Sequence, residues 1–330
     1  MELALLISQF YLFTWVDNFI KIIPLSKRAG FLFLTTMILE ELHECPVCKN
    51  STFTPYIGCK DYLVSQIDFN IQACTSCGLR FTNPRPNKES IGEFYQSADY
   101  VSHNDQSAGI VNKLYRLVRQ YTLRQKLNLI DSIYPKKGKV LDIGCGTGLF
   151  LDTCQKNGWS IAGVEPDTNA REIAVTRLKE NIVNDLSEIH DEQFDLITMW
   201  HVLEHVADLR ETVQELNRRL RKGGTLLLAL PNSDSHDAQY FKQYWAAYDT
   251  PRHLSHFTPS TINQLVSQTG FSLVDTKPMY FDSFYIGVLS TRNRDGRTNW
   301  LESIYQGIRS NWAGKRTGDY SSLIYIFMKS

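Results

Sequence analysis

A glycine-rich loop follows the first apolar strand predicted in the second half of the chain. Gly144, Gly146 and Gly148 stand at alternate positions in the segment VLDIGCGTG, residues 140–148. Glycines let a backbone turn tightly and approach a bound molecule more closely than residues with a Cβ atom can. The spacing is G-x-G-x-G, whereas G-x-G-x-x-G holds the pyrophosphate of nicotinamide and flavin cofactors. Such a loop alone is also compatible with an ordinary tight turn between a strand and a helix.

Polar and aromatic residues end the next predicted strands. Glu165 follows the second strand, where a carboxylate can accept hydrogen bonds from both hydroxyl groups of a ribose. Asp185 follows the third strand, where it could accept a hydrogen bond from an adenine amino group. Trp200 and His201 follow the apolar fourth strand. A tryptophan and a histidine at this edge of the sheet would be unusual if they served packing alone, so we expect them to line the ligand pocket.

A further group of polar residues occupies one loop after the fifth predicted strand. Tyr248, Asp249 and His253 are candidate catalytic groups, together with His201, since a histidine in such a loop can titrate near neutral pH. Arg252 could clamp an anionic substrate. The alternative is structural: Arg252 would pair with Asp249, and His256 would cap or pack on the next helix.

Aromatic residues precede and enter this loop, and they are interpreted as a lid over an acceptor molecule. Concave substrate sites are rich in aromatic side chains. The same residues could equally form a core beneath a long loop. They are Tyr240, Phe241, Tyr244, Trp245 and Tyr248.

Two C-x-x-C pairs indicate a metal site near the start of the chain. Cys45 and Cys48 form the first pair, and Cys74 and Cys77 form the second after 25 intervening residues. Four thiolates suit a tetrahedral structural Zn²⁺ with no open coordination position. The separation is longer than usual for four-cysteine sites, which leaves Cys59 as a conceivable substitute ligand.

The predicted elements explain how the chemistry-bearing residues are positioned. Residues 138–330 alternate strand and helix patterns as βαβ units do, and their apolar strands indicate a parallel sheet covered on both faces. Such sheets bind ligands beyond the carboxyl ends of their strands, which is where the glycine loop stands. The expected strands are 139–143, 160–164, 181–183, 194–199, 225–230, 271–277 and 323–328. The expected helices are 149–157, 168–180, 208–221 and 259–268.

Four segments are expected along the chain. They are an apolar N-terminal extension at 1–44, a zinc-ribbon-like module at 45–100, a helical connector at 101–135 and the α/β domain at 136–330. The apolar runs of the extension are too short to span a bilayer, so Met37 is a candidate natural start and a peripheral membrane anchor is the alternative.

The connector carries a basic side that is either simply solvated or meets phosphate groups. Its members are Lys113, Arg116, Arg119, Arg124 and Lys126.

Composition narrows the function. The chain has 330 residues with 35 Lys and Arg against 35 Asp and Glu, so no global positive field draws it to nucleic acid. Its 43% hydrophobic and 21% charged content is that of a folded protein. The seven cysteines suit a reducing, cytoplasmic compartment better than a disulfide framework.

Jointly, four segments resemble the class I S-adenosylmethionine (SAM)-dependent methyltransferases, in that family's motif order. They are LDIGCGTG, GVEPD, FDLITMWHVLEH and LRKGG. The resemblance implies a Rossmann-like, doubly wound seven-stranded sheet with an antiparallel last strand. It also implies that the three loop glycines pass under the methionine part of SAM and that Asp142 orients the loop or the amino group. Glu165 would hold the ribose, and Asp185 would lie near the adenine.

The segment LRFTNPRP, residues 79–86, resembles one found in bacterial methyltransferases that carry a zinc-binding module. Related arrangements occur in sugar-nucleotide methyltransferases and in a ribosomal RNA methyltransferase family, but the large C-terminal domain usual in the sugar enzymes has no room here. We therefore expect SAM-dependent methyl transfer to a small-molecule or glycan-type acceptor, with a structural Zn²⁺. The alternatives are an RNA methyltransferase that grips phosphates through the ribbon and the basic helix, and a non-catalytic SAM-binding scaffold. No integral membrane span is expected, and the oligomeric state stays open.

Overall fold

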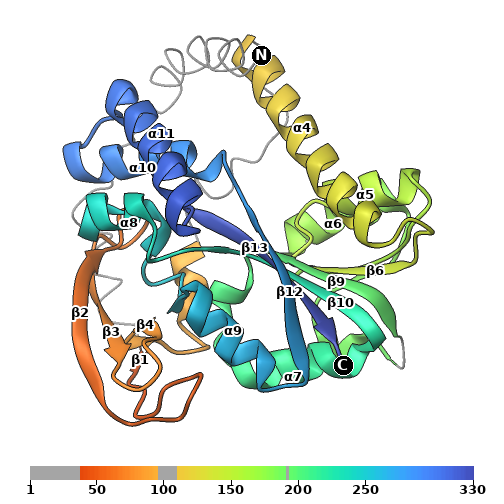
Figure 1. Ribbon diagram of the computed structural model, residues 1–330, viewed down its shortest axis with the longest axis horizontal. Coiled ribbons are helices and arrows are strands. Elements are labelled where there is room, and N and C mark those ends of the chain that lie inside the picture. The colour runs from red at the N-terminus through yellow and green to blue at the C-terminus, as the bar shows by residue number, and fades with distance from the viewer. Residues whose placement is uncertain (1–37, 96–109, 191–192) are drawn as a thin grey trace. The chain divides into compact units, whose positions relative to one another are not determined.

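The computed structural model describes residues 38–95, 110–190 and 193–330. The expectations about the N-terminal extension therefore lie almost entirely outside the described residues. The chain divides into two compact units, each built from several segments (Figure 1). We call the described parts of 38–116, 231–258 and 279–322 the cysteine unit, and those of 117–230, 259–278 and 323–330 the seven-stranded unit.

The seven-stranded unit is the predicted mixed sheet. Its strand order is β12-β13-β10-β9-β6-β7-β8. Strands β10, β9, β6, β7 and β8 run parallel, and β12 pairs with β13 in antiparallel register, which confirms the expected fold. The bounds are β6 Lys139–Ile143, β7 Ser160–Val164, β8 Ile182–Val183, β9 Phe194–Trp200, β10 Leu220–Pro231, β12 Phe271–Pro278 and β13 Ser322–Lys329.

Helices connect these strands, and their apolar faces build the core. The bounds are α4 Ile110–Ile133, α5 Leu149–Lys156, α6 Thr168–Leu178, α7 Leu209–Arg219 and α9 Pro259–Ser267. Leu127 and Ile130 of α4 pack with Leu151 of α5 and with Val140 and Leu196 of the sheet. Tyr121 of α4 lies outside this core and is 49% exposed.

The cysteine unit contains a four-stranded antiparallel sheet in the order β11-β4-β3-β2. Strands β2 Phe53–Lys60, β3 Asp68–Cys74 and β4 Arg80–Thr82 are consecutive, whereas β11 Ser255–His256 comes from much later in the chain. β11 pairs with β4 through Ser255 opposite Phe81 and His256 opposite Arg80. Two short strands, β1 Leu39–Glu40 and β5 Arg85–Pro86, form a separate antiparallel pair. In the chain, β1 precedes β2 and β5 follows β4.

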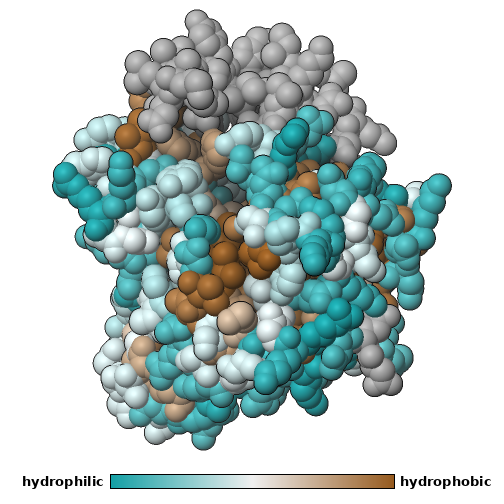
Figure 2. All heavy atoms as spheres, turned by 45° about the vertical axis from the view of Figure 1, so that its right-hand side comes forward, coloured by the Kyte–Doolittle hydropathy of each residue, from teal (hydrophilic) through white to brown (hydrophobic). Residues whose placement is uncertain are grey.

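Helices from the C-terminal part of the chain complete the cysteine unit. They are α8 His236–Phe241, α10 Asp282–Asp295 and α11 Trp300–Thr317. These residues were expected in one domain with the seven-stranded sheet, yet residues 231–258 and 279–322 belong to the cysteine unit. Among the described residues, no helix combines the length and the apolar character needed to cross a bilayer. On the face drawn in Figure 2, hydrophilic side chains predominate, and a compact group of hydrophobic side chains lies near the centre with smaller groups elsewhere.

Candidate functional site

The glycine loop leaves the end of β6 in a conformation that needs glycine. Gly144, Gly146 and Gly148 have φ values of 69°, 55° and 75°, in the left-handed region that L side chains rarely adopt. A Cβ atom at Gly144 would lie 2.5 Å from Cγ2 of Val202, so this position also lacks room for a side chain. A Cβ atom at Gly146 would meet nothing within 4 Å, so the loop presents bare backbone there.

Glu165 ties this loop to the end of β7. Its Oε2 accepts a hydrogen bond of 2.7 Å from the Gly146 amide, and its Oε1 accepts one of 2.9 Å from the Asp167 amide. Burial raises the pKa of Glu165, while these two amide donors act in the opposite direction. A carboxylate only 9% exposed thus lies beside the open backbone of the loop.

Asp142, the second-last residue of β6, is buried just before the glycine loop. It is 2% exposed and accepts a 2.6 Å hydrogen bond from the hydroxyl of Thr198 on β9. Burial raises the pKa of Asp142 to about 7, despite the opposing effects of Thr198 and the positive charge of Lys126. The group therefore changes protonation near neutral pH.

Trp200 and His201 lie at the end of β9, as predicted. Nζ of Lys126 lies 4.0 Å from the centre of the Trp200 ring, and Phe150 contacts the same ring edge-on at 5.5 Å. Nε1 of Trp200 is buried and has no hydrogen-bond partner among the described residues. His201 has φ of 57°, unusual for a residue other than glycine, and its Nδ1 lies 3.4 Å from Oε1 of the buried Glu204.

Asp185 follows β8 and is exposed. Its Oδ1 accepts hydrogen bonds of 2.9 Å from the amide and 2.6 Å from the hydroxyl of Ser187, so it caps a short 3₁₀ turn, η3 Leu186–Glu188. Because β6, β7, β8 and β9 run parallel, Asp185 follows the same edge of the sheet as the glycine loop, Glu165 and Trp200. A glycine cradle, strand-end carboxylates and a buried, unsatisfied indole N–H at one edge fit a nucleoside-bearing ligand.

In the loop after β10, Arg252 does not have the surroundings expected of a clamp for an anionic substrate. Arg252 is 1% exposed and donates to Asp249 at 2.6 Å and to Asp61 at 3.0 Å. It also donates to the Phe94 carbonyl at 3.0 Å. The structural alternative is therefore correct for Arg252. It pairs with Asp249, and it joins residues 249–252 to Asp61 and Phe94 within the cysteine unit.

The remaining loop residues have distinct surroundings. Tyr248 is 2% exposed, lies 5.3 Å from the His256 ring, and donates to the Tyr56 hydroxyl at 3.3 Å; burial raises its pKa. His256 is also buried, and burial holds its pKa well below the usual value, so this ring is neutral. His253 places Nδ1 2.8 Å from the Ala247 carbonyl. Because a carbonyl only accepts, Nδ1 carries the proton and Nε2 is the basic nitrogen of the neutral ring.

The lid interpretation of the aromatic segment is wrong for most of its members. Phe241, Trp245 and Tyr248 are each 2% exposed and form the core of the cysteine unit with Ile71 and Ile286. The sequence could not separate a lid from a core because the other side of this core comes from distant segments, Ile71 of β3 and Ile286 of α10. Of this segment, Tyr240 is the exposed member, at 41%.

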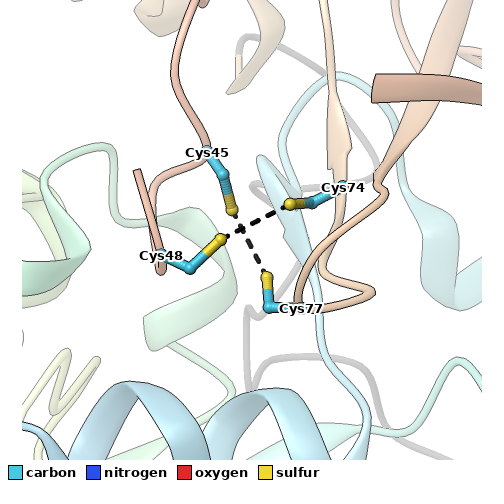
Figure 3. Close-up of side chains that lie close together, drawn as sticks. All are labelled: Cys45, Cys48, Cys74 and Cys77. Atoms are coloured by element: carbon cyan, nitrogen blue, oxygen red, sulfur yellow. Dashed lines mark hydrogen bonds between the residues drawn. The ribbon is translucent and has the colours of Figure 1, made fainter. Parts of the chain in front are cut away.

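Figure 3 shows the side chains of the two cysteine pairs converging. The four Sγ atoms lie within 4.8 Å of one another, with 3.5 Å between Cys45 and Cys77 and 3.5 Å between Cys48 and Cys74. A tetrahedron with zinc–sulfur bonds of about 2.3 Å has sulfur–sulfur edges of about 3.8 Å. The cluster therefore has the dimensions of a four-thiolate zinc site.

Local backbone turns aim the four thiols. Lys49 and Gly78, which directly follow the second cysteine of each pair, have φ values of 63° and 78°. Asn50 adds a hydrogen bond of 3.6 Å to the Cys74 sulfur. Contact with the Cys77 thiol lowers the pKa of Cys45 to about 5. Cys59 is not part of this cluster; it lies in the core of the unit, where burial raises its pKa to about 12.

Some residues that support the loop were not anticipated. Thr198 bonds Asp142, and Arg177 of α6 donates to the Thr147 carbonyl within the loop. A threonine in the middle of the apolar strand FDLITMW is a usable signal for Thr198. Lys126 was placed on the basic side of the connector, and its position over Trp200 depends on how α4 packs on the sheet.

Comparison with known proteins agrees with this geometry. Residues 115–276 match the methyltransferase domain family. Residues 115–276 therefore carry a methyltransferase domain. Its glycine loop, Glu165 and Asp185 all lie inside the matched residues.

Similar curated proteins include ubiquinone biosynthesis O-methyltransferases. The one from Rickettsia akari is 21% identical over 213 residues, which is 59% of this chain and 82% of that protein. The one from Paracidovorax citrulli is 29% identical over 121 residues, 33% of this chain, so the chain spans about half (51%) of its length. Among solved structures, one similar chain is magnesium protoporphyrin IX methyltransferase from Synechocystis with bound SAH. The alignment covers 74% of this chain and 100% of that chain, with 16% sequence identity and a TM-score of 0.49.

Proposed function

We propose that the chain transfers a methyl group from SAM to a small-molecule acceptor. The observation that carries the proposal is the pairing of the bare backbone at Gly146 with the carboxylate of Glu165, 2.7 Å from its amide. In this proposal Gly144, Gly146 and Gly148 lie under the methionine part of SAM. Glu165 accepts from the ribose hydroxyls, and Asp185 lies near the adenine.

Other residues complete the proposed cofactor site. The buried Asp142 holds the loop and faces the amino group of SAM. The Trp200 N–H and His201 stand at the end of the neighbouring strand and line the same site. SAM supplies an activated methyl group on its sulfonium, whose positive charge is dispersed during transfer, so alignment by these residues provides much of the rate.

The chemistry at the acceptor needs a base only where the acceptor atom carries a proton. The acceptor's electron pair forms the bond to the methyl carbon, the carbon–sulfur bond breaks, and the acceptor proton passes to a base. We propose His253 for this role because the Ala247 carbonyl holds its Nδ1 at 2.8 Å and leaves Nε2 basic. His201 is the second candidate. The burial of Tyr248 and the pairing of Asp249 with Arg252 favour supporting roles for these two residues.

We also propose a structural Zn²⁺ at Cys45, Cys48, Cys74 and Cys77. Four thiolates leave no open position, so the metal would hold the two turns of the module together and take no part in the transfer. This assignment is supported by the sulfur spacing and by the left-handed turn after each pair.

The small-molecule acceptor is supported by the balanced charge of the chain and by the names of the ubiquinone O-methyltransferases that it resembles at low identity. A glycan-type acceptor belongs to the same proposal. The atom that receives the methyl group is left to the experiment.

The test is transfer of labelled methyl groups from SAM into an extract of the native host, fractionated into small metabolites, glycans and lipids, RNA and protein. We expect label in the metabolite, lipid or glycan fraction. Label in RNA would instead support an RNA methyltransferase, and SAM binding without any labelled product would favour a non-catalytic scaffold. With the acceptor in hand, His253→Ala is expected to lower turnover and leave SAM affinity unchanged.

A further inference from the structure

Helix α11 of the cysteine unit exposes large apolar side chains, whereas most of its buried side chains are small or polar. Apart from Ile304, its buried positions are small or polar: Ser303, Gln306, Gly307, Ser310 and Gly314. Its exposed positions carry the large apolar side chains instead. These are Leu301 at 74%, Tyr305 at 56%, Ile308 at 44% and Trp312 at 57% exposed.

The small residues of the buried face have a clear packing reason. A Cβ atom at Gly307 would lie 2.5 Å from the Phe284 ring of α10, and one at Gly314 would lie 2.7 Å from the Tyr320 ring. Ser283 of α10 donates to the Gly307 carbonyl at 3.2 Å, and Ser310 donates to the buried Asp237 at 2.7 Å. Close packing thus accounts for the inner face and leaves the apolar outer face unexplained.

The apolar outer residues form one continuous stripe. They recur every third or fourth position along α11, so their side chains lie above one another on a single face. We call Leu301, Tyr305, Ile308 and Trp312 the outer stripe. A contiguous exposed apolar face of this kind marks an interaction site more often than scattered surface residues do.

Cations flank the outer stripe. The guanidinium of Arg316 lies 3.5 Å from the centre of the Trp312 ring, and that of Arg309 lies 5.7 Å from the Tyr305 ring. Lys315 is exposed at the same end of the helix. The acidic residue of α11, Glu302, is instead bound by Arg294 at 2.7 Å and by the Tyr240 hydroxyl at 2.8 Å. The charge beside the stripe is therefore positive.

We propose that the outer stripe of α11 docks on an anionic lipid bilayer. Tyr and Trp rings with apolar neighbours sit in the interfacial layer of a membrane, and adjacent Arg and Lys groups meet anionic headgroups. A second copy of the chain fits less well, because related copies would bring the same three cations together. This docking is independent of the proposed methyl transfer, since it needs neither SAM nor the glycine loop.

The test measures sedimentation of the full chain with lipid vesicles in the absence of SAM. We expect binding to vesicles of phosphatidylcholine mixed with phosphatidylglycerol, and much weaker binding to phosphatidylcholine alone. The double variant Ile308→Glu with Trp312→Glu should weaken partitioning at least about tenfold. Lys315→Glu with Arg316→Glu should weaken it at least about fivefold for each cation removed, and binding should fall as salt rises.

The matched control is Lys88→Glu, which makes the same change in net charge as Ile308→Glu with Trp312→Glu, at an exposed lysine elsewhere in the cysteine unit. It should bind vesicles nearly as the unmodified chain does. All variants alter exposed side chains, so thermal unfolding should be unchanged and will report any folding defect. Absence of vesicle binding, or binding that the stripe variants leave intact, would overturn the proposal. A dimer in analytical ultracentrifugation that Ile308→Glu with Trp312→Glu dissociates, without vesicle binding, would assign the stripe to a second copy instead.

Discussion

Single residues at the end of β7 and in the glycine loop decide what the seven-stranded unit can bind. Glu165 uses both carboxylate oxygens to hold backbone amides, one from the loop and one from the start of α6. The same oxygens are the acceptors that a ribose would need. Glu165 is therefore poised between an internal role and a ligand-binding role, and these roles can be separated by experiment.

Glu165→Ala is expected to weaken SAM binding by about 1–3 kcal/mol, roughly five- to 150-fold, through loss of hydrogen bonds to a charged group. Isothermal titration calorimetry measures the change. Glu172→Ala, on the exposed side of α6, is the control and should leave affinity unchanged. Equal affinities for Glu165→Ala and the unmodified chain would show that the cofactor placement is wrong.

Asp142 links protonation to stability. Its pKa is raised from 3.8 to about 7 in the folded chain, so between about pH 4 and 7 the folded state binds more protons than the unfolded state. Stability from this group therefore falls as pH rises through that window, by at most about 1.4 kcal/mol per pH unit.

Asp142→Asn keeps an oxygen that can accept from Thr198 but cannot ionise. Urea unfolding from pH 5 to pH 8 should show the unmodified chain losing stability relative to this variant. Parallel stability curves for the two proteins would mean that Asp142 does not titrate in this range.

At the scale of elements, the four-stranded sheet of the cysteine unit depends on a strand from outside the module. β11 adds to β4, and three residues before β11 the buried Arg252 joins Asp249, Asp61 and the Phe94 carbonyl. The four cysteines and β2–β4 are thus held from one side by residues 249–256.

Arg252→Met should lower the free energy of unfolding of the cysteine unit by about 3 kcal/mol or more, because it leaves the Asp61 carboxylate buried without its cation. Circular dichroism with urea measures the loss. Arg218→Met, at a 74% exposed guanidinium, should cost little. A variant of normal stability with altered acceptor kinetics would restore the substrate-clamp interpretation.

The elements also show what could be read from sequence. The strands of the seven-stranded sheet were predicted within a residue or two for β6, β7, β9 and β12, because apolar runs bounded by turn signals are local features. β10 was expected at 225–230, but it begins five residues earlier, at Leu220. Leu220 already pairs with Phe194, and the LRKGG residues form an irregularity in register before Thr225 pairs with Leu196. Helices α10 and α11 were not predicted. The buried face of α11 is mostly small and polar and its exposed face carries large apolar side chains, so its hydrophobic pattern does not point to the core.

In the candidate site, too, some residues could be predicted from local sequence and others could not. The roles expected for Gly144, Glu165 and the cysteines follow from residue spacing within short segments. The burial of Arg252, Trp245 and Tyr248 follows from contacts with residues far away in the chain, which spacing cannot reveal.

At the scale of the whole chain, the proposed cofactor site and the proposed metal site belong to different units. The glycine loop and Glu165 lie in the seven-stranded unit, and the four cysteines lie in the other. Loss of the metal should therefore affect the two properties unequally.

Cys74→Ser is expected to reduce bound zinc from about one per chain to nearly none, while SAM affinity stays within about twofold. Methyl transfer should fall at least about tenfold if the module shapes the acceptor site, because an unliganded module would not keep its fold. Elemental analysis, calorimetry and the labelled-methyl assay measure the three quantities. Cys59→Ala, outside the cluster, should retain zinc, and zinc loss in that control would contradict the four-cysteine assignment.

The late position of β11 has a consequence for biosynthesis. A nascent chain that has left the ribosome only as far as residue 100 already carries all four cysteines, but it lacks Arg252 and the strand that covers β4. The edge of β4 would then be open to pairing with other chains. Metal uptake can thus come early in synthesis, whereas completion of the module waits until residues 231–322 have emerged, and a fragment ending near residue 100 would be prone to aggregate.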